Sequence, residues 1–315
     1  MFWTDSIIYM VLSKDTKGIG AKYQIAGSES DPIHIHKSAY KDTTKKRVVF
    51  IRHGESDWNS IFNKGKNPMM IVRLIWAMIT EWTMLFAIDS PFLDSPLNKE
   101  GIQQALELRE FLFNKSDVSN NPEQKESIKE TLSSLRGENS NSILVSSTLR
   151  RAISTLTLAI WPRMEKSEEK IHLLSCAQEV SRNVDTCALS GLKEVPDLPF
   201  DRAAPYCANI SPANFNPALN LGNKGLKSTG KLRIETFNKW LFDCSHDTII
   251  VGGHSLWFKY YYNLCLPYST EHTAKTNKMV NSGVIAFDIY KSNSQNKFCI
   301  DPASIDVVYG GFEKK

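Results

Sequence analysis

Side chains suited to anion binding and proton transfer directly follow four apolar runs of this 315-residue chain. Guanidinium groups match phosphate oxygens in pairs, and a neutral imidazole is a competent nucleophile toward phosphorus. Histidines and arginines without nearby acidic or cysteine ligands make a poor metal site and a good site for a dianion. The residues are Arg52 and His53 after 48–51, Arg150 and Arg151 after 142–147, Glu179 after 171–175, and His254 after 247–253.

The apolar runs predict strands, and segments with helical spacing alternate with them. Such alternation is typical of an α/β domain with a largely parallel sheet and helices on both faces. Ligands of open α/β sheets bind outside the carboxyl ends of the strands. We therefore expect a three-layer α/β/α fold that gathers these side chains around one phosphoryl group. The predicted helices are 94–113, 149–160, 228–244 and 255–266, and 283–290 is predicted as the last strand.

Four motifs in this order, "RHGESDWN", "SSTLRRAIST", "AQE" and "GGHS", resemble those of the histidine phosphatase superfamily, in its phosphoglycerate mutase-like branch. The likeness runs from about Arg47 to Tyr290. It implies that His53 is the phosphorylated nucleophile, that Glu179 donates a proton to the leaving group, and that no metal or cofactor is needed. It also implies a set of phosphate-binding residues, namely Arg52, Asn59, Arg151 and His254.

Several positions in and near the motifs stay open. Arg151 is preferred to Arg150 because the family's arginine directly precedes the alanine. Asp185 is a second candidate for the proton donor. The residues that could contact the rest of the substrate are Glu55, Ser56, Arg182, Asp185 and Ser255.

Departures from the family pattern favour a phosphatase over a mutase. True phosphoglycerate mutases follow their glutamate with an Arg-x-Tyr-Gly type stretch and a Gly-x-Asn-Lys element, and "EVSRNVDTCALSG" has neither. Ser255 stands where the family commonly has glycine. The expected activity is therefore metal-independent phosphomonoester hydrolysis of a small phosphorylated substrate. A mutase or related phosphotransferase and a non-catalytic phosphoryl-binding scaffold are the alternatives.

The chain outside the motifs suggests an appendage and three insertions. "SIIYMVLS" and "AKYQIAG" predict a strand hairpin within residues 1–46, and 47–315 is expected to be the catalytic domain. His34 and His36 alternate with isoleucine there, as metal ligands or, the favoured reading, as an exposed strand face. The insertions lie near 60–90, 114–142, with a short helix in 124–137, and 196–225, an irregular cover.

Charge and cysteine content fit a cytoplasmic protein. The net charge of +4, from 38 Lys and Arg against 34 Asp and Glu, gives no reason to expect a nucleic-acid partner. The six cysteines lack metal-ligand spacing and are expected to be reduced.

The segment 69–88 is apolar and about as long as a membrane span. It contains Arg73 and Glu81, which disfavour insertion into a bilayer, and they share a narrow stripe on a helical wheel. We expect a nearly buried helix here, with contact to a membrane surface as the alternative.

Overall fold

The computed structural model describes residues 2–17, 43–62, 68–83, 89–114, 126–138, 141–198, 202, 204–293 and 297–313. A mixed sheet of eight strands runs through the described chain, in the order β4-β3-β2-β5-β1-β6-β7, with β8 paired to β6. The parallel strands are β1 (Thr43–Arg52), β2 (Ser142–Ser147), β3 (Ile171–Leu174), β4 (Phe215–Asn216) and β5 (Thr248–Gly253). This arrangement confirms the predicted largely parallel sheet.

The strand β6 (Val284–Ser292) pairs antiparallel with β1, and Arg47 lies opposite Asp288 in that pairing. The run 283–290 is therefore a strand as predicted. It is not the last one, because β7 (Phe298–Ile300) and β8 (Asp306–Tyr309) follow and pair antiparallel with β6. These strands were missed because they have only three and four residues, too few to show a period.

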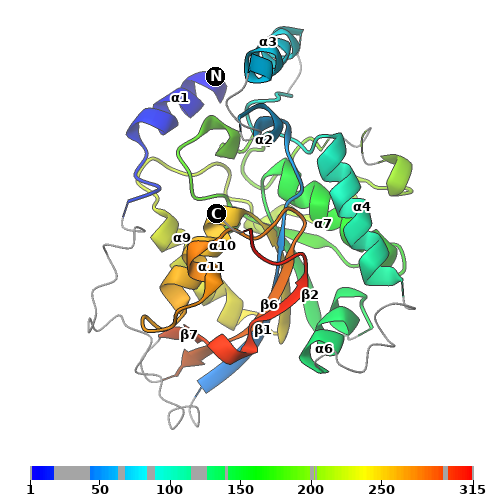
Figure 1. Cartoon of the computed structure of the whole chain (residues 1–315), viewed down its shortest axis with the longest axis vertical. Coiled ribbons are helices and arrows are strands. Elements are labelled where there is room, and N and C mark those ends of the chain that lie inside the picture. The colour runs from blue at the N-terminus through cyan, green and yellow to red at the C-terminus, as the bar shows by residue number, and fades with distance from the viewer. Residues whose placement is uncertain are drawn as a thin grey trace.

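Helices cover both faces of the sheet, which completes the predicted three layers (Figure 1). One face packs on α4 (Lys99–Phe113), α6 (Glu126–Leu135) and α7 (Arg150–Met164). The other packs on α9 (Gly230–Asp243) and α10 (Ser255–Cys265), through an aromatic cluster in which the rings of Phe50 and Phe258 stack at 4.1 Å.

The helix α7 continues past Pro162, although the sequence suggested that it ends there. Proline has no backbone N–H, so the carbonyl of Leu158, four residues earlier, loses its helical partner. The Nε of Arg109 donates to that carbonyl over 2.7 Å. The substitute hydrogen bond allows the helix to extend to Met164.

The N-terminal segment is a helix, α1 (Phe2–Leu12), so the predicted strand over 6–13 is wrong. Its isoleucines, tyrosine and valine have strand propensity, but Ser6, Tyr9 and Ser13 are buried at helical spacing. Tertiary packing thus decides the conformation. The second predicted strand, with His34 and His36, lies outside the described residues. The suggested boundary at 46 falls inside β1.

In its described part, the apolar segment 69–88 belongs to α3 (Pro68–Thr83), and α2 (Asp57–Phe62) precedes it. The prediction of a nearly buried helix is wrong. Only Ala77 is fully buried among the described side chains of α3, in a small cluster with Ile61 and Phe92. A helix that is apolar on all sides needs partners on all sides, and α3 has them on one. Among the described helices, none is both long enough and apolar enough to cross a membrane.

The remaining elements are short. The cover at 196–225 is less irregular than predicted, because its described part contains the strand β4, which pairs with β3, and three short 3₁₀ segments. One α-helical turn, α11, spans Thr273–Thr276. All six cysteines are free thiols. The 3₁₀ segments are η4 (Ser175–Ala177), η5 (Val184–Thr186), η6 (Ala204–Tyr206), η7 (Pro212–Asn214), η8 (Pro217–Leu219) and η9 (Pro302–Ser304).

Candidate active site

Two histidines meet at the carboxyl ends of the neighbouring strands β1 and β5. The register places Arg52 opposite Gly253, and the N–H of His53 donates to the carbonyl of Gly253 over 3.0 Å. His254 follows Gly253 directly. The two imidazole centroids lie 5.2 Å apart with the rings tilted by 57°. Parallel pairing therefore brings together side chains that are two hundred residues apart in sequence.

The ring of His53 is buried and held in one orientation. Its Nδ1 lies 2.5 Å from the carbonyl oxygen of Gly54. A carbonyl only accepts, so Nδ1 carries the proton and Nε2 has its lone pair free. Burial, reinforced by the positive charges of Arg151 and Arg52, holds the pKa of His53 well below its ordinary value of 6.5. The imidazole is thus neutral near pH 7.

Close backbone packing fixes the loop after His53. The N–H of Gly54 donates to the hydroxyl of Thr155 on α7 over 2.9 Å. A Cβ at Gly54 would lie 2.5 Å from the carbonyl oxygen of Gly101, at the start of α4. Glycine is needed here because two backbones touch.

The neighbouring arginines of "LRRA" have different surroundings. Arg150 is bound on all sides by the segment before α4, including Asp89, the carbonyl of Ser90 and both the backbone and the side chain of Asp94. Arg151 donates to the carbonyl of Asp185 over 2.8 Å and pairs with its carboxylate at 3.3 Å. Arg150 is therefore structural, and Arg151 belongs to the histidine site.

The guanidinium of Arg52 is held by the C-terminal segment. It donates to the carbonyl of Met279 and pairs with the carboxylate of Glu313 at 2.7 Å. Burial lowers the pKa of Arg52, and the charge of Glu313 opposes that effect. Its Nε is buried without a partner in the described part of the chain.

His254 is fully buried beside the carboxyl end of β2. Its Nε2 lies 2.8 Å from the hydroxyl of Ser147, the last residue of β2. Burial, with the charge of Arg151, holds the pKa of His254 well below 6.5. Its Nδ1 finds no hydrogen-bond partner among the described residues.

Three buried polar atoms of the site residues thus lack partners in the described structure. They are the Nε of Arg52, the Nδ1 of His254 and the Oδ1 of Asp185. Buried polar groups in native proteins are almost always hydrogen-bonded, and exceptions point to an absent ligand or water. Two of these atoms belong to residues predicted to bind the phosphoryl group.

The two candidate acids have different environments. The carboxylate of Glu179 accepts from the N–H of Val180 at 2.9 Å, of Trp257 at 2.8 Å and of Leu256 at 3.3 Å. It therefore caps the N-terminus of α10, where a negative charge is favoured. Burial raises the pKa of Asp185 to about 6, and the nearby charge of Arg151 opposes the rise.

A buried ionic group missed by the sequence analysis supports the Glu179 loop. Asp15 lies three residues after the end of α1. It pairs with Lys224 at 3.2 Å and with Arg233. The ammonium of Lys224 also donates to the carbonyls of Glu179 at 2.8 Å and Ser181 at 3.1 Å. Burial lowers the pKa of Lys224 to about 8, although Asp15 opposes the shift. A lone acid in "SKDTKG" reads as a surface turn, so the sequence held no signal for this role.

Three other predicted site residues follow the carboxyl end of β1 in the chain, namely Glu55, Ser56 and Asn59. Asn59 is half-buried on α2, and its N–H donates to the hydroxyl of Ser56 over 3.3 Å. Glu55 accepts from the side-chain amide of Asn98 at 3.2 Å, at the N-terminus of α4. Glu55 thus binds Asn98 and Ser56 binds Asn59, and the substrate contacts of Glu55 and Ser56 and the phosphate contact of Asn59 stay predictions.

Two further candidates lie near Glu179: Arg182 follows it by three residues, and Ser255 begins the helix that Glu179 caps. Arg182 is exposed and donates to the carbonyls of Met10 and Val11, at the end of α1. Ser255 is buried at the first position of α10. Arg182 therefore ties down α1, and substrate contacts of either residue stay predictions.

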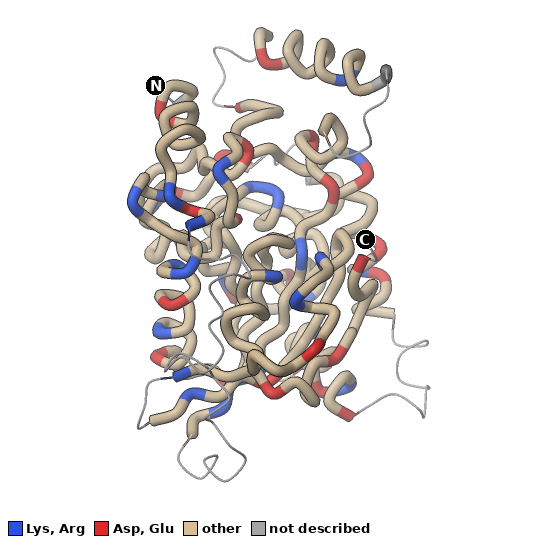
Figure 2. Tube along the Cα trace, turned by 60° about the vertical axis from the view of Figure 1, so that its left-hand side comes forward, with Lys and Arg blue, Asp and Glu red and all other residues tan. Residues whose placement is uncertain are grey.

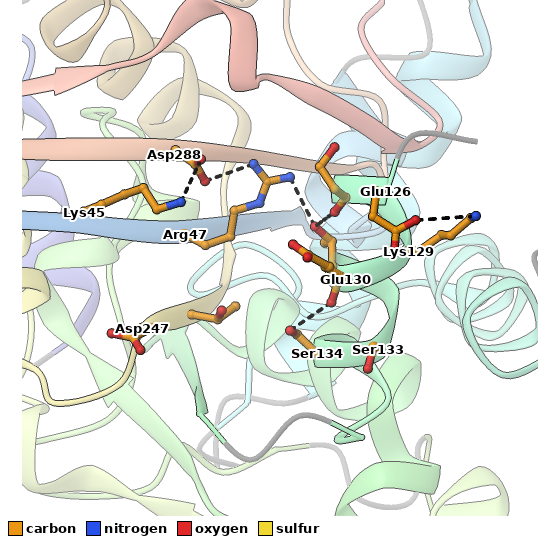
Figure 3. Close-up of a pocket in the computed structure, with 12 residues that line it drawn as sticks. Lys45, Arg47, Glu126, Lys129, Glu130, Ser133, Ser134, Asp247 and Asp288 are labelled. Atoms are coloured by element: carbon orange, nitrogen blue, oxygen red, sulfur yellow. Dashed lines mark hydrogen bonds and ion pairs between the residues drawn. The ribbon is translucent and has the colours of Figure 1, made fainter. Parts of the chain in front are cut away.

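A cavity of about 810 Å³ lies at the opposite end of the sheet, lined by Lys45 and Arg47 of β1 (Figure 3). Six residues separate Arg47 from His53, which is about 20 Å along a strand. Arg47 pairs with Asp288 at 3.1 Å and with Asp306 at 2.7 Å, and it also donates to Thr131. These bonds occupy the guanidinium of Arg47, and none of the residues predicted for the phosphoryl site lines this cavity.

In the described part of the chain, no cluster of three or more His, Cys, Asp and Glu residues could hold a metal ion.

No protein-family model matches the chain, and no curated protein matches it. Solved structures do. Mycobacterial hydrolase 1 shares 12% identity and a TM-score of 0.40, with 86% of this chain and 100% of that chain covered. A mycobacterial glucosyl-3-phosphoglycerate phosphatase shares 13% identity and a TM-score of 0.39, covering 81% and 97%. A phosphoserine phosphatase from Entamoeba histolytica, in complex with phosphoserine, shares 13% identity and a TM-score of 0.38, covering 84% and 95%.

Proposed function

We propose that the chain is a phosphomonoester hydrolase that acts through a phosphohistidine on His53, without a metal. The observation that carries this proposal is the buried pair of His53 and His254, with ring centroids 5.2 Å apart. Arg52 directly precedes His53, and Arg151 lies one turn before Thr155, whose hydroxyl binds the N–H of Gly54. The charges of both arginines lower the pKa of His53. Two neutral imidazoles with two guanidinium groups suit a phosphate dianion.

In the first step, Nε2 of His53 attacks phosphorus and the ester P–O bond breaks. The hydrogen bond from Nδ1 to Gly54 holds the ring in the required tautomer. Arg52, Arg151, Asn59 and His254 stabilise the negative charge on the equatorial oxygens, which is the main catalytic demand of phosphoryl transfer.

The leaving oxygen takes a proton from a carboxyl group, and two candidates remain. Glu179 is the acid that the motif resemblance assigns. Its carboxylate accepts three backbone N–H bonds at the N-terminus of α10. Burial raises the pKa of Asp185 to about 6, so this carboxyl group keeps its proton in the mildly acidic range. The raised pKa favours Asp185, and position in the motif favours Glu179.

In the second step, water attacks the phosphohistidine and the P–N bond breaks. The carboxylate left by the first step takes a proton from the water, so it is ready for the next cycle. Inorganic phosphate leaves and His53 is restored.

The test is phosphate release from an aryl phosphate in the presence of a chelator. We expect turnover, inhibition by vanadate, and an acid-labile, base-stable phosphoenzyme after rapid quenching. Full activity in His53→Ala would overturn the proposal. Conversion of 3-phosphoglycerate, with and without 2,3-bisphosphoglycerate, separates a hydrolase from a mutase.

A further inference from the structure

Exposed apolar side chains are concentrated on two helices. Of the 21 large apolar residues that are exposed in the described chain, five lie on α1 and seven on α3. Surfaces of this kind mark interaction sites, because soluble proteins rarely expose contiguous apolar patches. We call these twelve residues the apolar face: Ile7, Ile8, Met10, Val11, Leu12, Ile71, Val72, Ile75, Trp76, Met78, Ile79 and Trp82.

The helix α3 exposes its apolar side chains to solvent, which is the reverse of an ordinary surface helix. At 3.6 residues per turn, its seven exposed apolar side chains cover an arc of about 160°. Trp82 is 78% exposed and Trp76 is 66% exposed. The polar Glu81 instead faces the body of the protein, where it accepts from Trp3 and Ser90, each at 2.7 Å. A surface helix in water normally has its charges outside.

The helix α1 has the same arrangement. Ser6 and Tyr9 are buried, while Val11 and Leu12 are each 59% exposed. The bond from Trp3 to Glu81 joins the inner side of α1 to that of α3. Both helices project at the same end of the molecule in Figure 1, and the protruding helix at the top of Figure 2 is tan over most of its length.

Cations lie at the C-terminal end of α1. Lys14 and Lys17 are exposed just after the helix, and Arg182 binds its last carbonyls. Exposed Lys227 follows Leu226, whose carbonyl accepts from the N–H of Lys14 at 3.2 Å. Asp15 lies among them but is buried and paired with two cations. The exposed charges at the C-terminal end of α1 are therefore positive, and the exposed acid of this helix, Asp5, lies in its first turn.

We propose that the apolar face of α1 and α3 docks on an anionic lipid bilayer. Acyl chains would accept the aliphatic side chains, and tryptophan is favoured at the level of the headgroups. Headgroup phosphates would form ion pairs with Lys14, Lys17 and the nearby Lys227. The helices lie in the interface, since α3 has 16 residues and a span needs about 20.

Docking would also orient the phosphatase site. The carboxyl end of β1, with Arg52 and His53, points toward the end of the molecule that carries α1 and α3 (Figure 1). The segment after α3 binds Arg150, the neighbour of Arg151. A bilayer at the apolar face would therefore lie at the same end of the molecule as the carboxyl end of β1, which carries the phosphoryl site.

The test is flotation of the full chain with vesicles of phosphatidylcholine alone and of phosphatidylcholine with phosphatidylserine. We expect the chain to float with the second, and the double variant Trp76→Glu with Trp82→Glu to lose more than tenfold of this partitioning. Lys14→Gln with Lys17→Gln should weaken binding to the anionic vesicles by roughly 20-fold, since each cation near such a surface contributes about fivefold.

Leu232→Glu and Val307→Glu are the matched controls, because these residues are 53% and 49% exposed on α9 and β8. They should float like the wild type, and all variants should retain their circular dichroism. Failure of the wild type to float, or unchanged flotation of the Trp76 and Trp82 variant, would overturn the proposal. So would a dimer in sedimentation that this variant dissociates, since a second copy would then cover the face. Flotation needs no turnover, so the result stands apart from the proposed phosphatase activity.

Discussion

The imidazole rings of His53 and His254 lie 5.2 Å apart at the ends of two adjacent parallel strands. The two rings use different nitrogens for their hydrogen bonds. Nδ1 of His53 binds the carbonyl of Gly54, and Nε2 of His254 binds the hydroxyl of Ser147. One ring therefore has Nε2 free for attack, and the other has Nδ1 free for the phosphoryl oxygens. The pair is arranged for one nucleophile and one oxygen ligand.

The first prediction concerns the nucleophile. His53→Ala should lower kcat by at least about 10³-fold, since loss of a covalent nucleophile leaves only binding and charge stabilisation. Rapid quenching with a radiolabelled phosphoester should find no phosphoenzyme in this variant. His172→Ala is the control, because His172 is a half-buried histidine within β3 that belongs to none of the four motifs. Labelling of both variants to the same extent would contradict the assignment.

The second prediction uses pH to identify the proton donor. A donor must be protonated, and burial raises the pKa of Asp185 to about 6. We expect kcat/KM to fall as the pH rises through about 6. His53 stays neutral there, because its pKa lies well below 6.5.

Asp185→Asn should remove this limb and lower kcat by roughly 10²- to 10⁴-fold. Glu179→Gln should leave the limb in place. If the limb survives in Asp185→Asn and disappears in Glu179→Gln, the donor is Glu179.

The third prediction concerns the contact between Glu313 and Arg52. The carboxylate lies 2.7 Å from the guanidinium and is half exposed, so it occupies a donor that the phosphoryl group needs. Glu313→Gln should lower KM for an aryl phosphate and the inhibition constant of inorganic phosphate, each roughly threefold, as expected for an ion pair of modest strength whose carboxylate is half exposed. Glu271→Gln, an exposed acid, is the control. A higher KM in Glu313→Gln would mean that Glu313 orients Arg52 for binding.

The fourth prediction concerns Asp15. Removal of the acid from a buried ionic group leaves Lys224 and Arg233 without their shared partner, so Asp15→Ala should lower the free energy of unfolding by about 3 to 5 kcal/mol. Urea denaturation measures this loss. Asp5→Ala, on the exposed side of α1, should change it little. Equal stability of the two variants would show that Asp15 does not hold the loop.

Where hydrophobic spacing was long and regular, the sequence predicted the fold well. The run 142–147 forms β2 with the predicted bounds, and the site residues lie at strand ends as expected. Each of these strand ends carries its own short motif. The position of Arg52, His53 and His254 at strand ends could therefore be predicted without the structure.

Tertiary contacts decided what the sequence missed. The segment 6–13 has the residues of a strand, yet Ser6 and Tyr9 pack as one side of a helix. Asp15 and Glu313 are single acids in polar surroundings, and nothing local shows that they reach Lys224 and Arg52. The exposure of α3 was also beyond prediction, because composition gives the apolar character of a helix and not the number of its neighbours.

The bond of Asp15 to Lys224 joins residues 209 positions apart, and that of Glu313 to Arg52 joins residues 261 positions apart. The strand β6, which pairs with β1, also follows both histidines in the chain. During synthesis, the strand that ends just before His53 therefore gains its last neighbour only after both histidines have been made.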